Sequence, residues 1–165
     1  MNEGNPRTSH HATRHGFNLF ELVMVLAIMG IMAAIAAPRF GQASARYRAD
    51  VAARRICKDL GLASRAARNA GASRTFKFER SGGAYTGAYT ISSLAGLVKS
   101  SDTYRVDLSA DPYRSQVDSV NFGGSRKVMF NGYGQAGSSG TIVLKSGDLT
   151  RTVTFDATSG KASIQ

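Results

Sequence analysis

A single carboxylate, Glu21, lies near the start of an apolar run of the chain. The run from Gly16 to Pro38 reads GFNLFELVMVLAIMGIMAAIAAP and contains no other ionisable side chain. About twenty apolar residues are enough to cross a bilayer as one helix, and a carboxylate inside such a helix costs free energy unless it has a partner. Glu21 is therefore the first candidate functional residue. The alternative interpretation is that Glu21 extends to the lipid headgroups at the end of an ordinary anchor.

The other residue types form no pattern of an active site. His10, His11 and His15 have a metal-like spacing, but no carboxylate or cysteine completes a ligand shell, and the chain has no further histidine. The sequence contains no G-x-S-x-G motif and no phosphate-binding glycine loop before a helix. The aspartates are spread along the chain without the dense run of a calcium loop. We therefore expect no enzyme, no metal and no cofactor.

The chain is strongly basic, with a formal net charge of +10, and much of this charge falls between Arg39 and Arg80. A basic stripe can follow a phosphate backbone, so DNA is a candidate partner. Nucleic-acid readers usually add exposed aromatic residues, whereas the tyrosines here are scattered and are expected to be packed or in loops. A solvated face or a contact with acidic neighbours is the favoured interpretation. The candidate contact residues are Arg46, Arg48, Arg54, Arg55, Lys58, Arg65 and Arg68.

These residues need a long helix to position them. Apolar residues continue at steps of three to five beyond Pro38, which predicts an amphipathic helix over residues 39–71 that ends near Asn69, before Gly71. With residues 17–38 it makes one helix of about fifty residues, or about 75 Å, which is too long for one small globule. Its first half is expected to serve a membrane or a filament core. The expected inward-facing residues of the second half are Phe40, Ser44, Tyr47, Val51, Ile56, Leu60, Ala63 and Ala67.

Residues 72–165 consist of short alternating runs separated by glycines and serines, which predicts strands. The segment SGD, Ser146 to Asp148, predicts a hairpin between the two runs that flank it. About ninety residues suffice for one small antiparallel domain whose sheet packs on the inner face of the helix. The expected class is α+β, and the order of the earlier strands is left open. The runs are TFKFE, AYTI, TYRVDL, VDSVNF, KVMFN, TIVLK and TRTVTFD.

The segment that begins at Gly16 resembles the N-terminal segment of type IV pilins and type II secretion pseudopilins. The shared features are Gly16 followed by Phe17, Glu21 four residues later, and an apolar helix that contains a glycine and a proline. The chain departs from the family at Asn18, where threonine is usual, and at Phe20, where a branched aliphatic residue is usual. Neither departure affects the processing site or the acidic residue.

The resemblance implies that residues 1–16 are a leader. Prepilin peptidase would cut between Gly16 and Phe17 on the cytoplasmic face, Phe17 would be N-methylated, and Glu21 would become the fifth residue of the mature chain. The new cationic amine would then lie one helical turn from the Glu21 carboxylate, and a neighbouring subunit could offer the same pair. Processing would therefore create the assembly contact.

Small residues follow in the same helix. Gly30 with Ala34, and Ala33 with Ala37, are spaced by four, which lets helices approach closely. Pro38 cannot donate a backbone hydrogen bond and crowds the carbonyl of Ala34, so a kink or loosening is expected between Gly30 and Pro38. In related filaments this stretch can melt.

The C-terminal block VMFNGYGQAGSSGTIVLKSGDLTRTVTFDATSGKASI resembles the signature of H-type minor pseudopilins (GspH) and FimT-type minor pilins. The shared features are an F-x-x-x-G turn, a long hairpin and a final T-G-x strand. Many major pilins close their C-terminal loop with a disulfide, which a chain with a single cysteine cannot form. The single cysteine, Cys57, therefore agrees with the minor subfamily. Cys57 is expected to be a small residue packed on the helix.

The resemblance implies a minor pilin or pseudopilin subunit of a type IV pilus or a type II secretion pseudopilus. Its partners would be other such subunits, prepilin peptidase, an inner-membrane assembly platform and, before assembly, membrane lipid. Whether the machine secretes proteins, extends pili or imports DNA stays open. Two alternatives also stay open: a minor pilin that binds DNA through its basic surface, and an uncleaved single-span anchor with a soluble domain.

The resemblance and the charge distribution disagree on topology. The resemblance implies a bacterial inner-membrane protein with a cytoplasmic N-terminus and a periplasmic C-terminal domain. Two arginines, Arg7 and Arg14, precede the apolar run, and more arginines follow it closely. By the positive-inside rule, this distribution would leave the C-terminal domain in the cytoplasm. We follow the resemblance, because cleavage after Gly16 requires a cytoplasmic leader.

Overall fold

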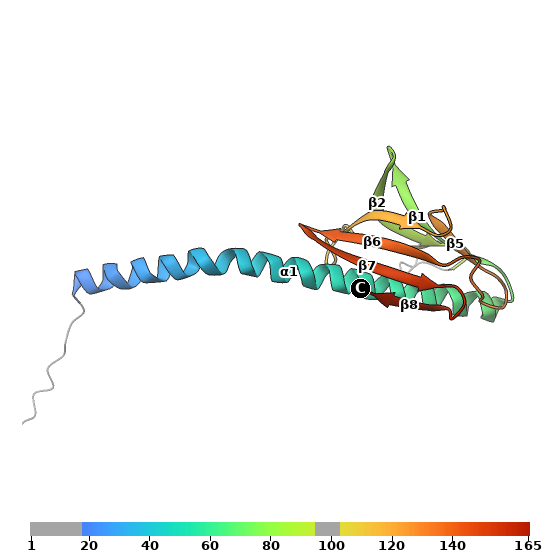
Figure 1. Cartoon of the computed structure of the whole chain (residues 1–165), viewed down its shortest axis with the longest axis horizontal. Helices are drawn as coiled ribbons and strands as arrows, with labels where there is room; N and C mark the ends of the chain where they lie inside the picture. Colours follow the sequence, from blue (N-terminus) through green and yellow to red (C-terminus); the bar gives the residue numbers. More distant parts are fainter. Residues whose placement is uncertain (1–17, 95–102) are drawn as a thin grey trace, which may run out of the picture. The chain divides into compact units, whose positions relative to one another are not determined.

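The computed structural model describes residues 18–94 and 103–165. The chain divides into two compact units, Met1–Arg39 and Phe40–Gln165. One helix and eight strands are assigned in the described residues, and the class is α+β (Figure 1).

Helix α1 spans Leu19–Ala70. At its start, the side-chain Oδ1 of Asn18 accepts a 3.4 Å hydrogen bond from the backbone N–H of Phe20, and the Asn18 carbonyl accepts one from Leu22. Asn18 is thus an N-cap residue. At its end, the N–H of Gly71 bonds to the carbonyl of Arg68 and the N–H of Ala72 to that of Ala67, with Gly71 at φ +57°. This is a Schellman C-cap, which confirms the prediction that Gly71 ends the helix.

The first sheet has the order β3-β2-β1-β5 and is antiparallel throughout. Consecutive strands pair as hairpin neighbours except for β5, which pairs with β1 across a long stretch of chain in the register Arg74↔Phe130. The strands are β1 (Arg74–Ser81), β2 (Ala84–Ile91), β3 (Tyr104–Asp107) and β5 (Lys127–Phe130).

The second sheet has the order β4-β6-β7-β8 and is also antiparallel. Strands β6 and β7 form the hairpin predicted at Ser146 to Asp148, with the register Ser146↔Leu149 at its tip. The expectation of one sheet was therefore wrong, because β5 joins β1 while β4 joins β6. The strands are β4 (Gln116–Asn121), β6 (Gly140–Ser146), β7 (Leu149–Asp156) and β8 (Lys161–Ile164).

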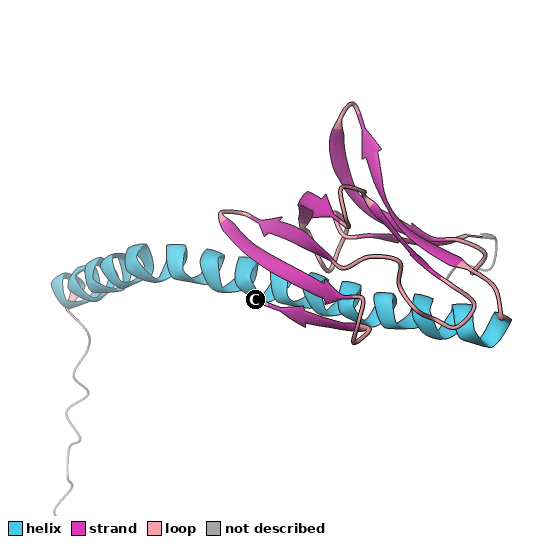
Figure 2. Ribbon diagram, turned by 45° about the vertical axis from the view of Figure 1, so that its right-hand side comes forward, coloured by secondary structure: helices cyan, strands magenta, loops and turns pink. Residues whose placement is uncertain are grey.

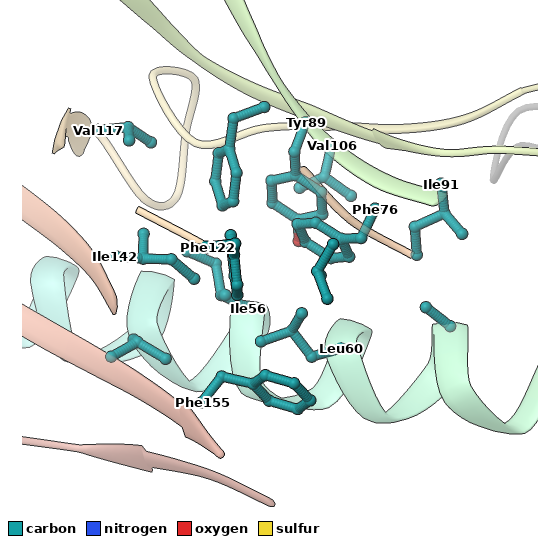
Figure 3. Packing of buried hydrophobic residues seen from close by; sticks show 14 of the residues in the cluster. Ile56, Leu60, Phe76, Tyr89, Ile91, Val106, Val117, Phe122, Ile142 and Phe155 are labelled. Carbon is teal, nitrogen blue, oxygen red and sulfur yellow. The ribbon is translucent and has the colours of Figure 1, made fainter. Parts of the chain in front are cut away.

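Both sheets lie beside the second half of α1 within the unit Phe40–Gln165, and their inner faces share one hydrophobic cluster with it (Figure 2). Small residues of the helix leave room for aromatic rings from the sheets, and Phe76 stacks on Tyr89 with a ring separation of 4.6 Å. Ile56 and Leu60 point toward these rings (Figure 3). The buried helix residues are Ala49, Ala52, Ala53, Ile56, Leu60, Ala63 and Ala67.

The inner face of α1 begins later than the sequence predicted. Phe40 and Tyr47 are 77% and 71% exposed, Ser44 is exposed and Val51 is half-buried. Tyr47 and Ile56 are nine residues apart, which is about 180° around a helix of 3.6 residues per turn. The predicted stripe therefore joined two opposite faces, and the five-residue step from Val51 to Ile56 is where it crossed the helix.

Candidate functional site

The apolar part of α1 has no cover within the described residues. Eighteen consecutive residues of this part have a mean hydropathy of 2.5, and none of these residues is buried. Its large side chains are about half exposed or more, from Val25 at 44% to Leu19 at 79%. By length and composition this helix is able to cross a membrane, and its exposure excludes the packing of an ordinary buried core helix.

Glu21 lies in the first turn of α1, three residues after the N-cap Asn18. The backbone N–H groups there carry partial positive charge, which favours a carboxylate at this position. Within the described residues, the Glu21 carboxylate is exposed and makes no hydrogen bond or ion pair. Gly16 and Phe17, the predicted cleavage site, lie outside the described residues, and so do the three histidines.

Gly30 faces open space. A Cβ atom added there would meet nothing within 4 Å. Glycine destabilises a helix interior by about 1 kcal/mol relative to alanine, and no contact in the described chain requires it. Helix α1 has no break at Gly30 or Pro38. The kinking or melting of this stretch stays a prediction.

Most of the predicted basic residues lie on exposed parts of α1. Arg54, Lys58 and Arg65 occupy the face opposite the core, and they make no hydrogen bond or ion pair within the described residues. Arg46 and Arg68 are exposed on the flanks, while Arg48 is half-buried. An anionic partner can therefore reach at least part of each of these six side chains.

Arg55 is the exception among the candidates. Its Nε donates to Asp59 Oδ2 at 3.0 Å and its Nη2 donates to Tyr104 Oη at 2.7 Å. Burial disfavours the Arg55 charge, but the attraction of Asp59 outweighs it and raises the pKa of the guanidinium. Arg55 thus holds the helix to the first sheet, and because its side chain is still 29% exposed, its place in a contact surface stays a prediction.

The same buried group contains two tyrosines that the sequence did not place. Tyr89 Oη and Tyr104 Oη donate to Asp59 Oδ2 at 2.6 and 2.8 Å. Burial, followed by the hydrogen bond to Asp59, raises the pKa of Tyr104 to about 12, and burial raises the pKa of Tyr89 as well. The spacing of Arg55 and Asp59 by four residues was a signal for the ion pair. Nothing in the sequence pointed to the tyrosines.

An open groove of about 210 Å³ lies beside the exposed cations. It is lined by Val51, Arg54, Arg55, Lys58 and Tyr113. The groove thus combines an aromatic ring with three cations, one of which is engaged with Asp59. The expectation that the tyrosines are packed or in loops was wrong for Tyr47, which is exposed on the helix; Tyr133 is 81% exposed in a loop.

The F-x-x-x-G segment forms a turn against the end of α1. Phe130 is buried, and Gly134 has φ +76°. A Cβ on Gly134 would lie 2.8 Å from the carbonyl oxygen of Ser64 and from Cγ of Arg68, and Ser64 Oγ donates to the Gly134 carbonyl at 2.8 Å. The motif therefore has a packing explanation, since only glycine fits this approach.

Within the described part of the chain, Cys57 has no features of a reactive or metal-binding thiol. Cys57 is a half-buried free thiol beside the core, and burial raises its pKa. A thiol with a raised pKa is a weak nucleophile. In residues 18–94 and 103–165, no three histidine, cysteine or carboxylate side chains cluster as metal ligands would.

Comparison of the chain with protein-family models, with curated proteins and with solved structures finds no significant match.

Proposed function

We propose that this chain is a minor pilin or pseudopilin subunit, of the H-type and FimT-type group, that assembles through its N-terminal helix. The observation that carries the proposal is the 52-residue helix α1, whose apolar half is exposed with Glu21 in its first turn and whose second half is built into a two-sheet unit. The resemblance of the Gly16-Phe17 and Glu21 pattern adds the processing step.

The proposed assembly step follows from electrostatics. Cleavage between Gly16 and Phe17 converts a neutral amide into a cationic amine, which is then methylated. Glu21 makes no bond within the described residues, so it is available to the amine of a neighbouring subunit. Pairing reduces the cost of a carboxylate in an apolar medium. Gly30, which no contact in the chain requires, allows close approach of a second helix.

The proposed location follows the same reasoning. Before assembly, the apolar half of α1 holds the subunit in the bacterial inner membrane, with the leader in the cytoplasm and the two-sheet unit in the periplasm. Assembly then moves the subunit into a pseudopilus or pilus. The assembly platform of the inner membrane and prepilin peptidase are the expected partners.

The intact mass of the membrane-extracted protein, with and without prepilin peptidase, tests the proposal. Loss of residues 1–16 together with one added methyl group on Phe17 is the expected result. A Gly16→Leu variant should keep its leader, which serves as the control for site-specific cleavage. An intact N-terminus in the presence of active peptidase would favour the uncleaved single-span anchor.

A Glu21→Gln variant tests the assembly contact separately. It should be cleaved normally but should be lost from sheared or sedimented filaments, because an amide cannot pair ionically with the Phe17 amine. Asp148→Asn, which removes an exposed carboxylate from a turn of the β6–β7 hairpin, is the matched control and should leave incorporation unchanged.

The basic groove supports a second candidate function, DNA binding. Arg54, Lys58 and Tyr113 line one groove, so cations and an aromatic ring lie together as in binders of nucleic acids. Binding to duplex DNA should fall steeply with salt and should weaken in an Arg54→Gln, Lys58→Gln, Arg65→Gln variant. The control replaces three exposed lysines of the strands by glutamine: Lys77, Lys127 and Lys161. Equal binding by both variants would exclude this groove as the DNA site.

A further inference from the structure

The outer face of α1 in the unit Phe40–Gln165 carries aromatic and apolar residues first and cations after them. The first group is Phe40, Tyr47 and Val51, and the second is Arg54, Lys58 and Arg65. The spacing is close to multiples of 3.6, so these side chains form one stripe opposite the buried residues. We name this stripe of six residues the outer stripe.

Within the described chain, five of the six residues of the outer stripe are exposed, and Val51 is half-buried in the groove that Tyr113 also lines. Phe40 and Tyr47 are 77% and 71% exposed, although aromatic rings of this size are normally at least partly covered. Arg54, Lys58 and Arg65 are without hydrogen bonds or ion pairs in the part of the chain that the structure describes. The stripe therefore offers apolar area and positive charge together.

The acidic side chains near the outer stripe already form ion pairs with arginines. Asp50 accepts a 2.6 Å hydrogen bond from Arg151, Asp59 is buried with Arg55, and Asp111 is paired with Arg114 at 2.6 Å. No described carboxylate lies among the six residues of the stripe. The face thus carries a net positive charge, because each of these neighbouring carboxylates is paired with an arginine.

We propose that the outer stripe binds the surface of an anionic phospholipid bilayer before the subunit assembles. The stripe follows directly in the chain after the apolar half of α1, so membrane insertion of that half keeps the stripe at a high effective concentration near lipid. Aromatic residues favour the interface between hydrocarbon and water, and arginine and lysine pair with lipid phosphates. The order along the stripe, with the aromatic residues nearest the apolar half, favours a bilayer over free nucleic acid.

This binding requires the helix to change direction near the end of the apolar run. Tyr47 lies ten residues beyond Ala37, or about 15 Å along a straight helix, whereas the headgroup layer is only about 5–8 Å thick. A perpendicular helix would therefore hold Tyr47 in water. Pro38 lacks the N–H that would bond to Ala34, and Gly41 follows closely, so the chain has the residues for a bend at this point.

The chain contains no tryptophan, so one introduced tryptophan reports on one position. Tyr47→Trp in the full chain, reconstituted in vesicles of phosphatidylcholine with phosphatidylglycerol, is read by quenching with lipids brominated near the headgroup. The expected loss is roughly half of the emission, because a residue in the interface touches the quencher. Tyr133→Trp, on an exposed loop outside the stripe, is the control and should lose little emission.

A charge test uses the same probe. Replacing Arg54, Lys58 and Arg65 by glutamine should reduce Tyr47→Trp quenching to the level found in phosphatidylcholine alone. The matched replacement of Lys77, Lys127 and Lys161 should leave the quenching unchanged, since these lysines lie on strands outside the stripe. Equal quenching in both triple variants would overturn the role of the stripe cations.

The inference rests on the membrane insertion included in the proposed function. A Leu26→Trp variant in the apolar half distinguishes a failure of membrane insertion from a failure of the outer stripe to bind lipid. If deep bromines quench Leu26→Trp while Tyr47→Trp behaves like Tyr133→Trp, insertion stands and the lipid-bound stripe is wrong. If Leu26→Trp is also unquenched, both the membrane insertion and the lipid-bound stripe are wrong.

A blue-shifted but unquenched Tyr47→Trp would mean that another copy of the chain covers the stripe. Loss of DNA binding with unchanged lipid quenching in the stripe triple variant would assign the cations to DNA. Both results overturn the proposal.

Discussion

Tyr89 Oη donates a 2.6 Å hydrogen bond to Asp59 Oδ2, which joins the middle of the first sheet to the buried face of α1. The same oxygen accepts from Tyr104 and Arg55, so one carboxylate connects the helix with both β2 and β3. Asp59 is 4% exposed and therefore depends on these partners for its charge to be tolerated. The second half of α1 is thus fixed to the sheets by polar contacts as well as by the apolar core.

Replacing Asp59 should strongly destabilise the two-sheet unit. Asp59→Ala leaves the Arg55 guanidinium and two tyrosine hydroxyls without their acceptor, and breaking a buried pair costs about 3–5 kcal/mol. The side chain of Arg55 is 29% exposed, so water compensates part of this cost and we expect about 3 kcal/mol. Urea unfolding of the full chain in mild detergent, followed by circular dichroism, measures the change.

Asp50 provides the control for this prediction. It is on the same helix and forms an ion pair with Arg151 at 2.6 Å, but both side chains are about a third exposed. Asp50→Ala should cost less than about 1 kcal/mol, as exposed pairs do. Similar losses for the two variants would show that the Asp59 group contributes nothing beyond an ordinary surface pair.

Stability should also fall at alkaline pH because of the two tyrosines. The pKa of Tyr104 is raised to about 12 and that of Tyr89 is raised too, so the folded state holds protons that the unfolded state releases near pH 10. The contribution is fully present below about pH 10 and is lost as the pH rises through the folded pKa, from about 10 to about 12 for Tyr104.

Unfolding midpoints in urea, measured across this range, check the prediction. Tyr104→Phe should unfold with a weaker pH dependence above pH 10, whereas Tyr133→Phe, in an exposed loop, should follow the unmodified chain. A Tyr104→Phe profile that coincides with that of the unmodified chain would refute the assignment.

Gly134→Ala should destabilise the fold more than Gly124→Ala. Both glycines have positive φ, +76° and +85°, so alanine costs about 1–2 kcal/mol at either position. A Cβ at Gly124 meets nothing within 4 Å, whereas one at Gly134 meets Ser64 and Arg68 at 2.8 Å. Overpacking adds about 1–3 kcal/mol at Gly134. Thermal unfolding of the two variants gives the difference, and equal midpoints would show that the turn moves away from the helix at no cost.

The sequence predicted those features that depend on local periodicity. The long helix, its end at Gly71, the strand runs and the β6–β7 hairpin all follow from spacing and turn residues. The pairing of β5 with β1 brings Phe130 beside Arg74, and no local pattern encodes a contact between such distant segments.

The surface of α1 shows the same limit on prediction. Periodicity marked apolar positions on the helix, but it could not tell that Tyr47 faces outward and Ile56 inward, since each fits a three-to-five-residue step. The hydrogen bond from Arg55 to Tyr104 could not be predicted either, because Tyr104 lies on a strand far along the chain. Composition alone showed that the apolar half is long and apolar enough to cross a membrane, whereas its exposure is known only from the structure.

Gly30→Leu should separate folding from assembly. Gly30 and Gly41 are both in α1, and a Cβ at either position would meet nothing within 4 Å, so leucine at each should not lower the helix content or the unfolding midpoint of the two-sheet unit. Gly30 lies in the apolar half, where the proposed filament contact packs helices closely, and a bulky side chain there holds two backbones apart. Filaments recovered by shearing should therefore contain much less of Gly30→Leu than of Gly41→Leu. Equal incorporation would mean that Gly30 faces lipid or solvent in the assembled state and that close helix packing occurs elsewhere.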